Sequence, residues 1–168
     1  MKKVRIGVIG AGLRGGLALY WHKPEGDSEI VALADVSQDR LDKFQEKFDT
    51  PLFLTKNYQE LLKRDDIDAI AVLSPDNLHE EHIIACLKAG KHVYAEKPLA
   101  ITVEGCDRIL DAWKSSGKHL MVGFNMRYMS MYQTMKGLID SGAIGDLKAI
   151  WVRHFVGFGG YFYYHDWH

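Results

Sequence analysis

The chain has 168 residues, 47% of them hydrophobic and 26% charged, and its formal net charge is −1. Acidic and basic residues are interspersed, so nothing indicates a nucleic-acid surface or a polybasic membrane patch. No apolar run reaches the roughly 18 residues that a membrane span needs, and the N-terminus shows no signal-peptide pattern. Cys86 and Cys106 lie among apolar neighbours and are expected to be reduced, buried thiols, with a disulfide as the alternative. We therefore expect a cytoplasmic globular protein.

From the N-terminus, strand and helix patterns alternate with short connections. The expected strands cover residues 4–9, 30–36, 51–54, 68–73, 91–95 and 119–122. One helix is expected after a glycine-rich loop and runs to about residue 21. Further helices are expected over 38–48, 58–63, 77–89 and 103–116. In the last of these, the apolar side chains of Val103, Cys106, Leu110 and Trp113 fall on one face. The alternation predicts an α/β fold over residues 1–123, with a doubly wound parallel sheet and helices on both faces.

The pattern changes after residue 123. A helix is expected over 129–139, and a long strand over 146–156 leads into the aromatic tail "GFGGYFYYHDWH". This strand is too long for another short parallel strand, and alone it would expose a large apolar surface. We expect residues 124–168 to begin an incomplete α+β domain, and the strand to be accounted for by missing downstream chain, by another copy of this chain or by disorder.

The first expected strand runs into "GAGLRG", residues 10–15, and a helix follows. Gly10 permits a tight turn, Gly12 lets backbone N–H groups approach a pyrophosphate, and Gly15 lets the helix pack closely on the strand. The N-terminus of the helix adds partial positive charge and free N–H donors. Arg14 is placed to lean over the phosphates, or else it is a solvated loop residue. The loop predicts a dinucleotide site, and with it a Rossmann dinucleotide-binding domain over residues 1–123.

Asp35 ends the second expected strand, about 20 residues beyond the loop. A carboxylate there accepts both ribose hydroxyls of adenosine and repels a 2′-phosphate, which favours NAD over NADP. Arg40 would help NADP only if it folded back. The alternative interpretation of Asp35 is the N-cap of the helix that begins at Gln38.

Three segments follow parallel strands and are expected to meet beyond the carboxyl edge of the sheet: 74–77, 96–98 and 124–127. Lys97 is carried there by its strand, and Glu96 is expected to point to the opposite side. A cis Lys97–Pro98 bond would turn the chain sharply. His79 and His82 are three residues apart, which does not match a zinc signature. His79 is expected to bond at the surface or crevice, and His82 to be structural; no metal site is expected.

Four segments together resemble the glucose–fructose oxidoreductase / inositol dehydrogenase (Gfo/Idh/MocA) family: "VIGAGLRG", "ALADVSQDRL", "AVLSPDNLHEEHIIACLKAGKHVYAEKPLA" and "MVGFNMRY". The resemblance implies a two-domain NAD(P)-dependent oxidoreductase of sugars, inositols and related polyols, with Lys97 as the catalytic lysine. The cofactor contacts that it implies are Gly10, Ala11, Gly12, Leu13, Arg14, Gly15, Asp35, Ser74, Pro75, Asn77, His79, Glu96, Lys97 and Asn125. The resemblance also implies that residues 124–168 begin the domain that makes substrate contacts and oligomer contacts, with a homo-oligomer formed through the long strand. The catalytic Asp and His typical of the family's second domain match no residue of this chain.

The reaction implied is oxidation or reduction of a secondary alcohol by hydride transfer. Lys97 would take or relay the hydroxyl proton, or polarise the oxygen. Arg127 and Tyr128 would reach a polar substrate, or instead stabilise the first helix of the second domain. Two alternatives remain open: an NAD-binding regulatory or fragment module without catalysis, and an NAD-dependent glycoside hydrolase.

Overall fold

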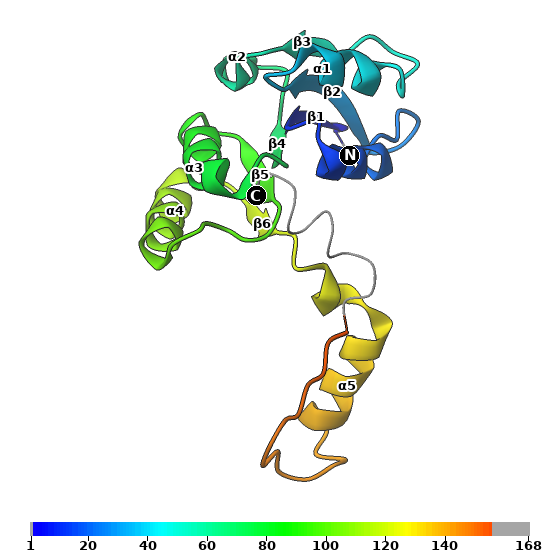
Figure 1. Cartoon of the computed structure of the whole chain (residues 1–168), viewed down its shortest axis with the longest axis vertical. Helices are drawn as coiled ribbons and strands as arrows, with labels where there is room; N and C mark the ends of the chain where they lie inside the picture. The colour runs from blue at the N-terminus through cyan, green and yellow to red at the C-terminus, as the bar shows by residue number, and fades with distance from the viewer. Residues whose placement is uncertain (1, 156–168) are drawn as a thin grey trace. The chain divides into compact units, whose positions relative to one another are not determined.

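The computed structural model describes residues 2–155, and the chain divides into two compact units at Gly123/Phe124 (Figure 1). The first unit holds all six strands assigned in the described chain, and the second contributes two helical segments. Each unit is described by itself below.

The first unit is built on one six-stranded sheet in which every strand is parallel to its neighbours. Its strands are β1 Val4–Ile9, β2 Ser28–Ala34, β3 Phe53–Thr55, β4 Ala69–Val72, β5 His92–Ala95 and β6 Leu120–Val122. The order across the sheet is β3-β2-β1-β4-β5-β6, the doubly wound order of dinucleotide-binding domains. The predicted fold is therefore confirmed: β1 has the predicted bounds, and each of the other five strands differs from its predicted range by one or two residues at one or both ends.

The helical segments of the first unit are η1 Leu13–Tyr20, α1 Gln38–Gln45, α2 Tyr58–Leu62, η2 Asp76–Leu78, α3 His79–Lys88 and α4 Val103–Ser116. Both η1 and η2 are 3-10 helices. The helical segment that follows the glycine loop, η1, is therefore wound more tightly than an α-helix. The hydroxyl of Thr102 caps α4 by accepting the Gly105 N–H. Gly90 and Gly117, with φ of 73° and 64°, follow α3 and α4, as glycine does at left-handed helix ends.

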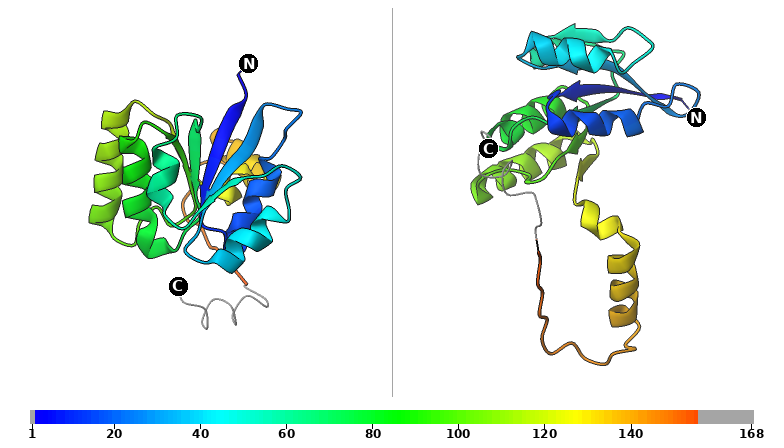
Figure 2. Two further views of the ribbon diagram at one scale, coloured as in Figure 1. Left: turned by 90° about the horizontal axis from the view of Figure 1, so that it is seen from above. Right: turned by 45° about the vertical axis from the view of Figure 1, so that its right-hand side comes forward.

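Two hydrophobic layers cover the two faces of the sheet, because successive strand residues point to opposite sides. In β4, Ile70 and Val72 pack with α2, α3 and α4. Ala71 and Leu73, the alternate residues, pack with η1 and α1. Figure 2 (left) shows α3 and α4 on one side of the sheet and η1 and α1 on the other. This crossover of helices from one face to the other opens a crevice between β1 and β4.

The apolar stripe expected on α4 does not form the core face of that helix. Gly105 and Ile109 are buried, whereas Val103 is 73% exposed and Trp113 39% exposed. Ile109 of α4 packs in the same core layer as the buried residues of α3. The buried face of α4 is therefore not the face that carries its predicted apolar stripe. Packing against a neighbouring helix decided the orientation.

The second unit contains η3 Asn125–Tyr128 and α5 Ser130–Asp140. The helix α5 ends at Asp140, one residue later than predicted, and Gly142, with φ of 72°, follows it. The long strand predicted over 146–156 is wrong for residues 146–155, which carry no strand, and residue 156 and the aromatic tail lie outside the described residues. A strand needs a hydrogen-bonded neighbour, and the described part of this unit supplies none. The homo-oligomer, whose partner chain would supply such a neighbour, stays a prediction.

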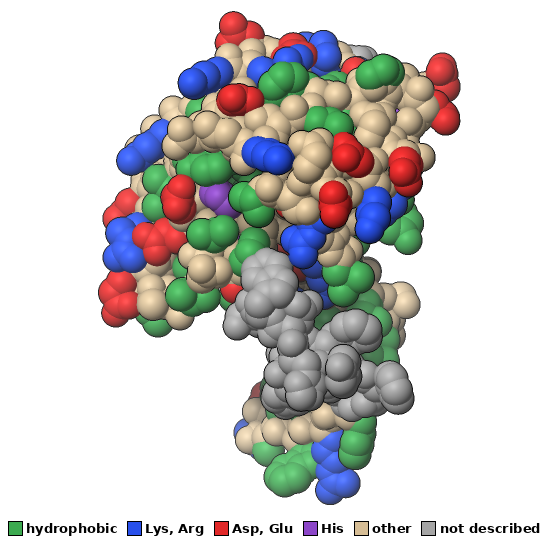
Figure 3. Space-filling view, turned by 45° about the horizontal axis from the view of Figure 1, so that its top comes forward, with side chains coloured by type: hydrophobic (Ala, Val, Ile, Leu, Met, Phe, Trp, Pro, Cys, Tyr) green, Lys and Arg blue, Asp and Glu red, His purple; other side chains and the backbone are tan. Residues whose placement is uncertain are grey.

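Charged side chains of both signs are mixed over the face shown in Figure 3. This agrees with a net charge of −1. Within residues 2–155, no helix combines the length and apolar character needed to cross a bilayer. Cys86 and Cys106 are both free thiols; Cys86 is buried and Cys106 is half-buried.

Candidate functional site

The glycine loop closes directly on the end of β4. Gly10 has φ of 102°, and a Cβ built on it would lie 2.5 Å from the carbonyl oxygen of Leu73. Its N–H donates to the Ala34 carbonyl at the end of β2, at 2.8 Å. Only glycine satisfies both the backbone angle and the close approach. Gly10 therefore draws the ends of three neighbouring strands together at the crevice.

The remaining glycines of the loop have opposite surroundings. A Cβ on Gly15 would meet the Gly10 carbonyl oxygen at 2.9 Å and the ring of Phe44 at 3.4 Å, so this glycine lets η1 pack closely. A Cβ on Gly12 would meet nothing within 4 Å. The side chain of Leu13 is 92% exposed. The surface above Gly12 is therefore open to a ligand, next to the N–H groups that begin η1.

Asp35 links the end of β2 to this loop. One carboxylate oxygen accepts the Ala11 N–H at 2.8 Å, and the other accepts the Ser37 N–H at 2.9 Å. The hydroxyl of Ser37 caps α1 by accepting the Arg40 N–H at 3.4 Å. The N-cap interpretation of Asp35 is therefore wrong, because Ser37 fills that position. The carboxylate is held at the loop, and each oxygen keeps a lone pair for a further donor.

The end of β5 lies beside the end of β4. Val72 and Ala95 are paired in register, and the Glu96 N–H donates to the Val72 carbonyl at 3.0 Å. Lys97 follows at once with its side chain exposed. The Lys97–Pro98 bond is cis, as expected from the sequence. The sheet therefore delivers a free ammonium group next to the loop that begins at Ser74.

Glu96 is buried at 8% exposure and does not share the surroundings of Lys97. Its carboxylate accepts the Lys97 backbone N–H at 3.3 Å and the Tyr94 hydroxyl at 3.5 Å. Burial, with the negative charge of Glu96, raises the pKa of Tyr94, and the nearby charge of Arg14 opposes that rise. The Tyr94 ring meets Trp21, the residue that follows η1, edge-on, with centroids 4.8 Å apart. Glu96 and Tyr94 thus form part of the wall facing the glycine loop.

Sequence reasoning missed Tyr94, although a signal was present. Tyr94 and Glu96 are two apart on one strand, so their side chains share a face. A Cβ on Gly123 would lie 2.5 Å from the Tyr94 hydroxyl and 3.2 Å from a Glu96 carboxylate oxygen. Because Gly123, which directly follows β6, has no side chain, the side chains of Tyr94 and Glu96 have the space they occupy.

His79 and His82 are both buried, at 0% and 7% exposure. The ring nitrogens of His79 lie 2.6 Å from the Pro98 carbonyl oxygen and 2.9 Å from that of Ser74. His82 Nδ1 lies 2.8 Å from the Ser74 hydroxyl oxygen, and burial lowers the pKa of His82. His82 is structural, as expected. The surface alternative for His79 is wrong, because its ring has no exposed area, whereas its two contacts lie in the expected crevice segments at Ser74 and Pro98. Its contact with the cofactor stays a prediction.

The other expected site residues divide between the two units. Ser74 and Pro75 are half-buried at the end of β4, and Asn77 is exposed in η2. Asn125, Arg127 and Tyr128 are exposed in η3 of the second unit, which is described separately. The first unit by itself therefore brings together the glycine loop and the segments at Asp35, Ser74 and Lys97.

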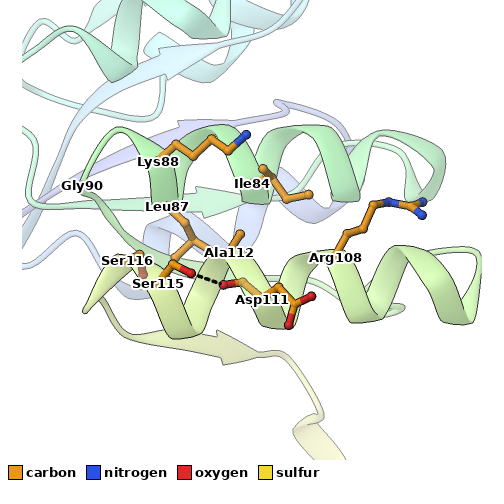
Figure 4. Close-up of a pocket in the computed structure, with 9 residues that line it drawn as sticks. All are labelled: Ile84, Leu87, Lys88, Gly90, Arg108, Asp111, Ala112, Ser115 and Ser116. Atoms are coloured by element: carbon orange, nitrogen blue, oxygen red, sulfur yellow. Dashed lines mark hydrogen bonds between the residues drawn. The ribbon is translucent and has the colours of Figure 1, made fainter.

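A pocket of about 620 Å³ lies elsewhere, between α3 and α4 (Figure 4). Its lining residues are Ile84, Leu87, Lys88, Gly90, Arg108, Asp111, Ala112, Ser115 and Ser116. None of them belongs to the strand-end segments described above. Arg108 is already paired with Glu80 through two hydrogen bonds of 2.5 and 3.0 Å. The groove is therefore separate from the crevice.

Comparison with known proteins agrees with this geometry. Residues 4–124 match the model of the family described as "Oxidoreductase family, NAD-binding Rossmann fold" (GFO_IDH_MocA). The myo-inositol 2-dehydrogenase of Thermotoga maritima is 37% identical over 145 residues, which cover 84% of this chain and 42% of that protein. The chain spans less than half the length of such curated relatives.

Two solved structures extend the comparison. Scyllo-inositol dehydrogenase from Lactobacillus casei, with bound NAD(H) and scyllo-inositol, has a TM-score of 0.79 at 27% identity, over 86% of this chain and 43% of that one. A 3-ketoreductase from Actinomadura kijaniata, in complex with TDP-benzene and NADP, has a TM-score of 0.76 at 33% identity, over 87% and 46%. The expected Gfo/Idh/MocA resemblance is confirmed: this chain belongs to the oxidoreductase family with an NAD-binding Rossmann fold.

Proposed function

We propose that the protein is an NAD-dependent oxidoreductase that acts on a secondary alcohol of an inositol or a related polyol or sugar. The observation that carries the proposal is the arrangement of one crevice: Asp35 and the open surface over Gly12 at one strand end, and the exposed Lys97 at another. The inositol dehydrogenases among the relatives support the polyol class. Residues 124–168 are assigned to the start of a substrate and oligomerisation domain.

The crevice fits a dinucleotide. The space above Gly12 accepts a pyrophosphate, with N–H groups of η1 and the side chain of Arg14 beside it. Asp35 accepts the ribose hydroxyls and disfavours a 2′-phosphate, which supports NAD rather than NADP. Leu13 and Ser74 to Asn77 would line the same crevice, and Asn125 is proposed as a further cofactor contact. The bound nicotinamide would supply the acceptor or donor of hydride.

Lys97 carries the proton in this proposal. Lys97 lies in the connection between β5 and α4, two residues after the end of β5, and its side chain is exposed. As a general acid or base it would exchange a proton with the substrate hydroxyl as the carbon changes oxidation state. Glu96 stays behind Lys97, bound to its backbone N–H, and does not compete for the ammonium. Arg127 and Tyr128 are proposed to meet polar groups of the substrate.

The first test is a titration of the 168-residue chain with NADH and NADPH, followed by fluorescence. We expect NADH to bind more tightly than NADPH. No binding of either nucleotide would contradict the cofactor site.

The second test uses the full product of the reading frame that encodes this sequence. Lys97→Ala is expected to lower inositol-dependent NAD reduction by about 100-fold or more, as for loss of an acid–base group, with little change in NADH affinity. Lys88→Ala, an exposed lysine on α3, is the matched control. Turnover within a few-fold of the parent would remove Lys97 from the mechanism. Product analysis separates oxidation from glycoside cleavage, and binding without turnover would indicate a regulatory module.

A further inference from the structure

His92 and His119 lie together where the last two strands of the sheet begin, at the end of the sheet away from the crevice. His92 is the first residue of β5, and His119 directly precedes β6. The backbone N–H of His119 donates to Nδ1 of His92 at 3.0 Å, and the two rings stack with centroids 5.0 Å apart. In the described sheet β6 is an edge strand with β5 as its neighbour. The His92 ring therefore takes part in holding an edge strand.

This hydrogen bond defines the protonation state of the ring. A backbone N–H only donates, so Nδ1 must offer its lone pair, and the neutral ring carries its hydrogen on Nε2. A protonated imidazole has hydrogen on both nitrogens and accepts no bond. Adding a proton to His92 would therefore remove the acceptor and set two N–H donors against each other.

The surroundings of His92 favour the neutral ring. Burial lowers the pKa of His92 below its usual 6.5, and the charges of His119 and Lys118 add to the shift. Asp68 opposes it, because a carboxylate favours the charged ring. The direction of the shift agrees with the hydrogen bond, which also stabilises the neutral form.

The other charged groups near the ring are engaged elsewhere. The carboxylate of Asp68 pairs with the Lys2 ammonium group at 2.9 Å and accepts the Arg5 backbone N–H at 2.9 Å. The ammonium group of Lys91 donates to the backbone carbonyls of residues 64 and 67, at 2.6 and 2.9 Å. Within residues 2–155, no carboxylate is hydrogen-bonded to the His92 ring, so a proton added there has no anionic partner in contact.

The strand β6 has three residues, so each bond at its ends matters. The Val93 N–H donates to the His119 carbonyl, and the Gly123 N–H donates to the Ala95 carbonyl, each at 2.8 Å. The bond from His119 to His92 is the further hold on the amino end. At the other end Gly123 borders the crevice wall, so loosening of β6 reaches the proposed site.

We propose that His92 is a pH-dependent switch of the edge strand: the neutral ring holds the amino end of β6 on β5, and protonation releases it. When β6 detaches, the ring loses the bond and part of its burial, and its pKa returns toward 6.5. The detached state therefore binds a proton more readily than the attached state, and its population rises as pH falls below about 6.5. This inference concerns the fold and holds whether or not the proposed function is correct.

The protonation state of the ring is measured by NMR. In the 168-residue chain with ¹⁵N-labelled histidine at pH 7.5, His92 should show a bare Nδ1 and a protonated Nε2. Its signals are identified by their loss in His92→Asn. A protonated Nδ1 at this pH would overturn the switch, because the ring could not then accept the His119 N–H.

Release of the strand is measured by amide hydrogen exchange at pH 7.5 and 5, expressed as protection relative to the unfolded chain at each pH. Protection of the His119 and Gly123 amides should fall about twofold to tenfold at the lower pH, the population change that one lost hydrogen bond allows. The Leu73 amide, bonded to the Ile9 carbonyl between the central strands, reports global unfolding. An equal fall at Leu73 would show loss of the whole fold rather than release of β6, and would overturn the proposal.

Two substitutions of His92 separate the lone pair from the proton. His92→Asn places an amide oxygen near the position of Nδ1, which accepts the His119 N–H and does not titrate. The His119 and Gly123 amides of this variant should stay protected at both pH values. His92→Leu offers no acceptor and should show the lower protection at both. The same fall with pH in His92→Asn as in the parent would contradict the role of His92.

His119→Asn is the matched control for the second ring. It keeps the backbone N–H that bonds to His92 and removes the other imidazole of the stack. In a pH series the fall in protection should remain, with its midpoint at higher pH, because the charge of His119 no longer lowers the pKa of His92. Disappearance of the pH dependence would mean that His119 is the titrating group and that the assignment to His92 is wrong.

Discussion

The carboxylate of Asp35 accepts the backbone N–H of Ala11 at 2.8 Å, across 24 residues of sequence. This bond joins the end of β2 to the glycine loop that follows β1. It also occupies an N–H that the sequence assigned to the cofactor, and leaves the neighbouring Gly12 as the open position of the loop. The proposed ribose-binding carboxylate and the proposed phosphate-binding loop are therefore bonded to each other within the chain itself.

Replacing the Asp35 carboxylate should weaken NADH more than NADPH. We expect Asp35→Asn to raise the Kd for NADH about tenfold to hundredfold, because hydrogen bonds to a charged acceptor are lost. The loss for NADPH should be smaller, since repulsion of its 2′-phosphate is removed at the same time. Fluorescence titration with both nucleotides measures the ratio. Asp39→Asn, an exposed carboxylate on α1, serves as the control, and an unchanged NADH/NADPH ratio in Asp35→Asn would contradict the assignment.

Two alanine variants in the glycine loop should separate stability from binding. At Gly10 the new methyl group meets the Leu73 carbonyl oxygen at 2.5 Å and φ is 102°, so Gly10→Ala should lower the free energy of unfolding by about 2–4 kcal/mol. At Gly12 nothing lies within 4 Å of the new methyl group, so the fold should keep its stability. The same methyl group would fill the space proposed for the pyrophosphate, and NADH affinity should fall. Urea unfolding and NADH titration check the pair; an equal loss of stability in both variants is the contrary result.

The buried thiol of Cys86 should make the fold less stable at high pH. Burial raises the pKa of Cys86 from 9.0 to about 12. The thiol of the unfolded chain ionises from about pH 9 while the native thiol stays neutral, so stability falls between about pH 9 and 12, by at most about 1.4 kcal/mol per pH unit. Urea unfolding at pH 8 and 10.5 should show a smaller fall for Cys86→Ala, although this variant is less stable at both values. Tyr94, whose pKa is also raised, contributes to the fall that remains.

The buried imidazole of His82 should act in the opposite direction, at low pH. Burial lowers the pKa of His82 below its usual 6.5, while the charge of Glu81 partly opposes the shift and His79 adds to it. The unfolded chain therefore binds a proton that the native state resists, and stability is lost as pH falls below about 6.5. His82→Asn, which keeps an amide near Ser74, should reduce that loss in urea unfolding at pH 7.5 and 5. It should not abolish it, because burial also lowers the pKa of His92.

The exposed His154 supplies the control for this measurement. His154→Asn replaces an exposed side chain outside the core layers. A pH dependence altered equally by His82→Asn and His154→Asn would show that burial of His82 is not the cause.

Much of the first unit follows from local patterns. Short apolar runs that alternate with amphipathic segments are buried on both sides, and only a parallel sheet with helices on both faces provides that. Three features each come at or just after the end of an expected strand: the glycine loop at 10–15, Asp35 and Lys97. Their convergence at one edge of the sheet could therefore be predicted. The caps Thr102, Gly90 and Gly117 were likewise readable from the sequence, because each answers a local backbone requirement.

The tertiary structure decided what depends on a neighbour. The apolar stripe of α4 stays exposed because the helix turns Ile109 toward α3, a choice that periodicity along one helix does not contain. No strand forms over residues 146–155, since a strand requires a partner to accept its hydrogen bonds. His79 became a buried link between Ser74 and Pro98, residues 5 and 19 positions away, because parallel strands bring those carbonyls to one side chain. In the first unit, the sequence thus determined which helices and strands form and at which edge of the sheet the strands end. Packing determined which side chains are buried at that edge.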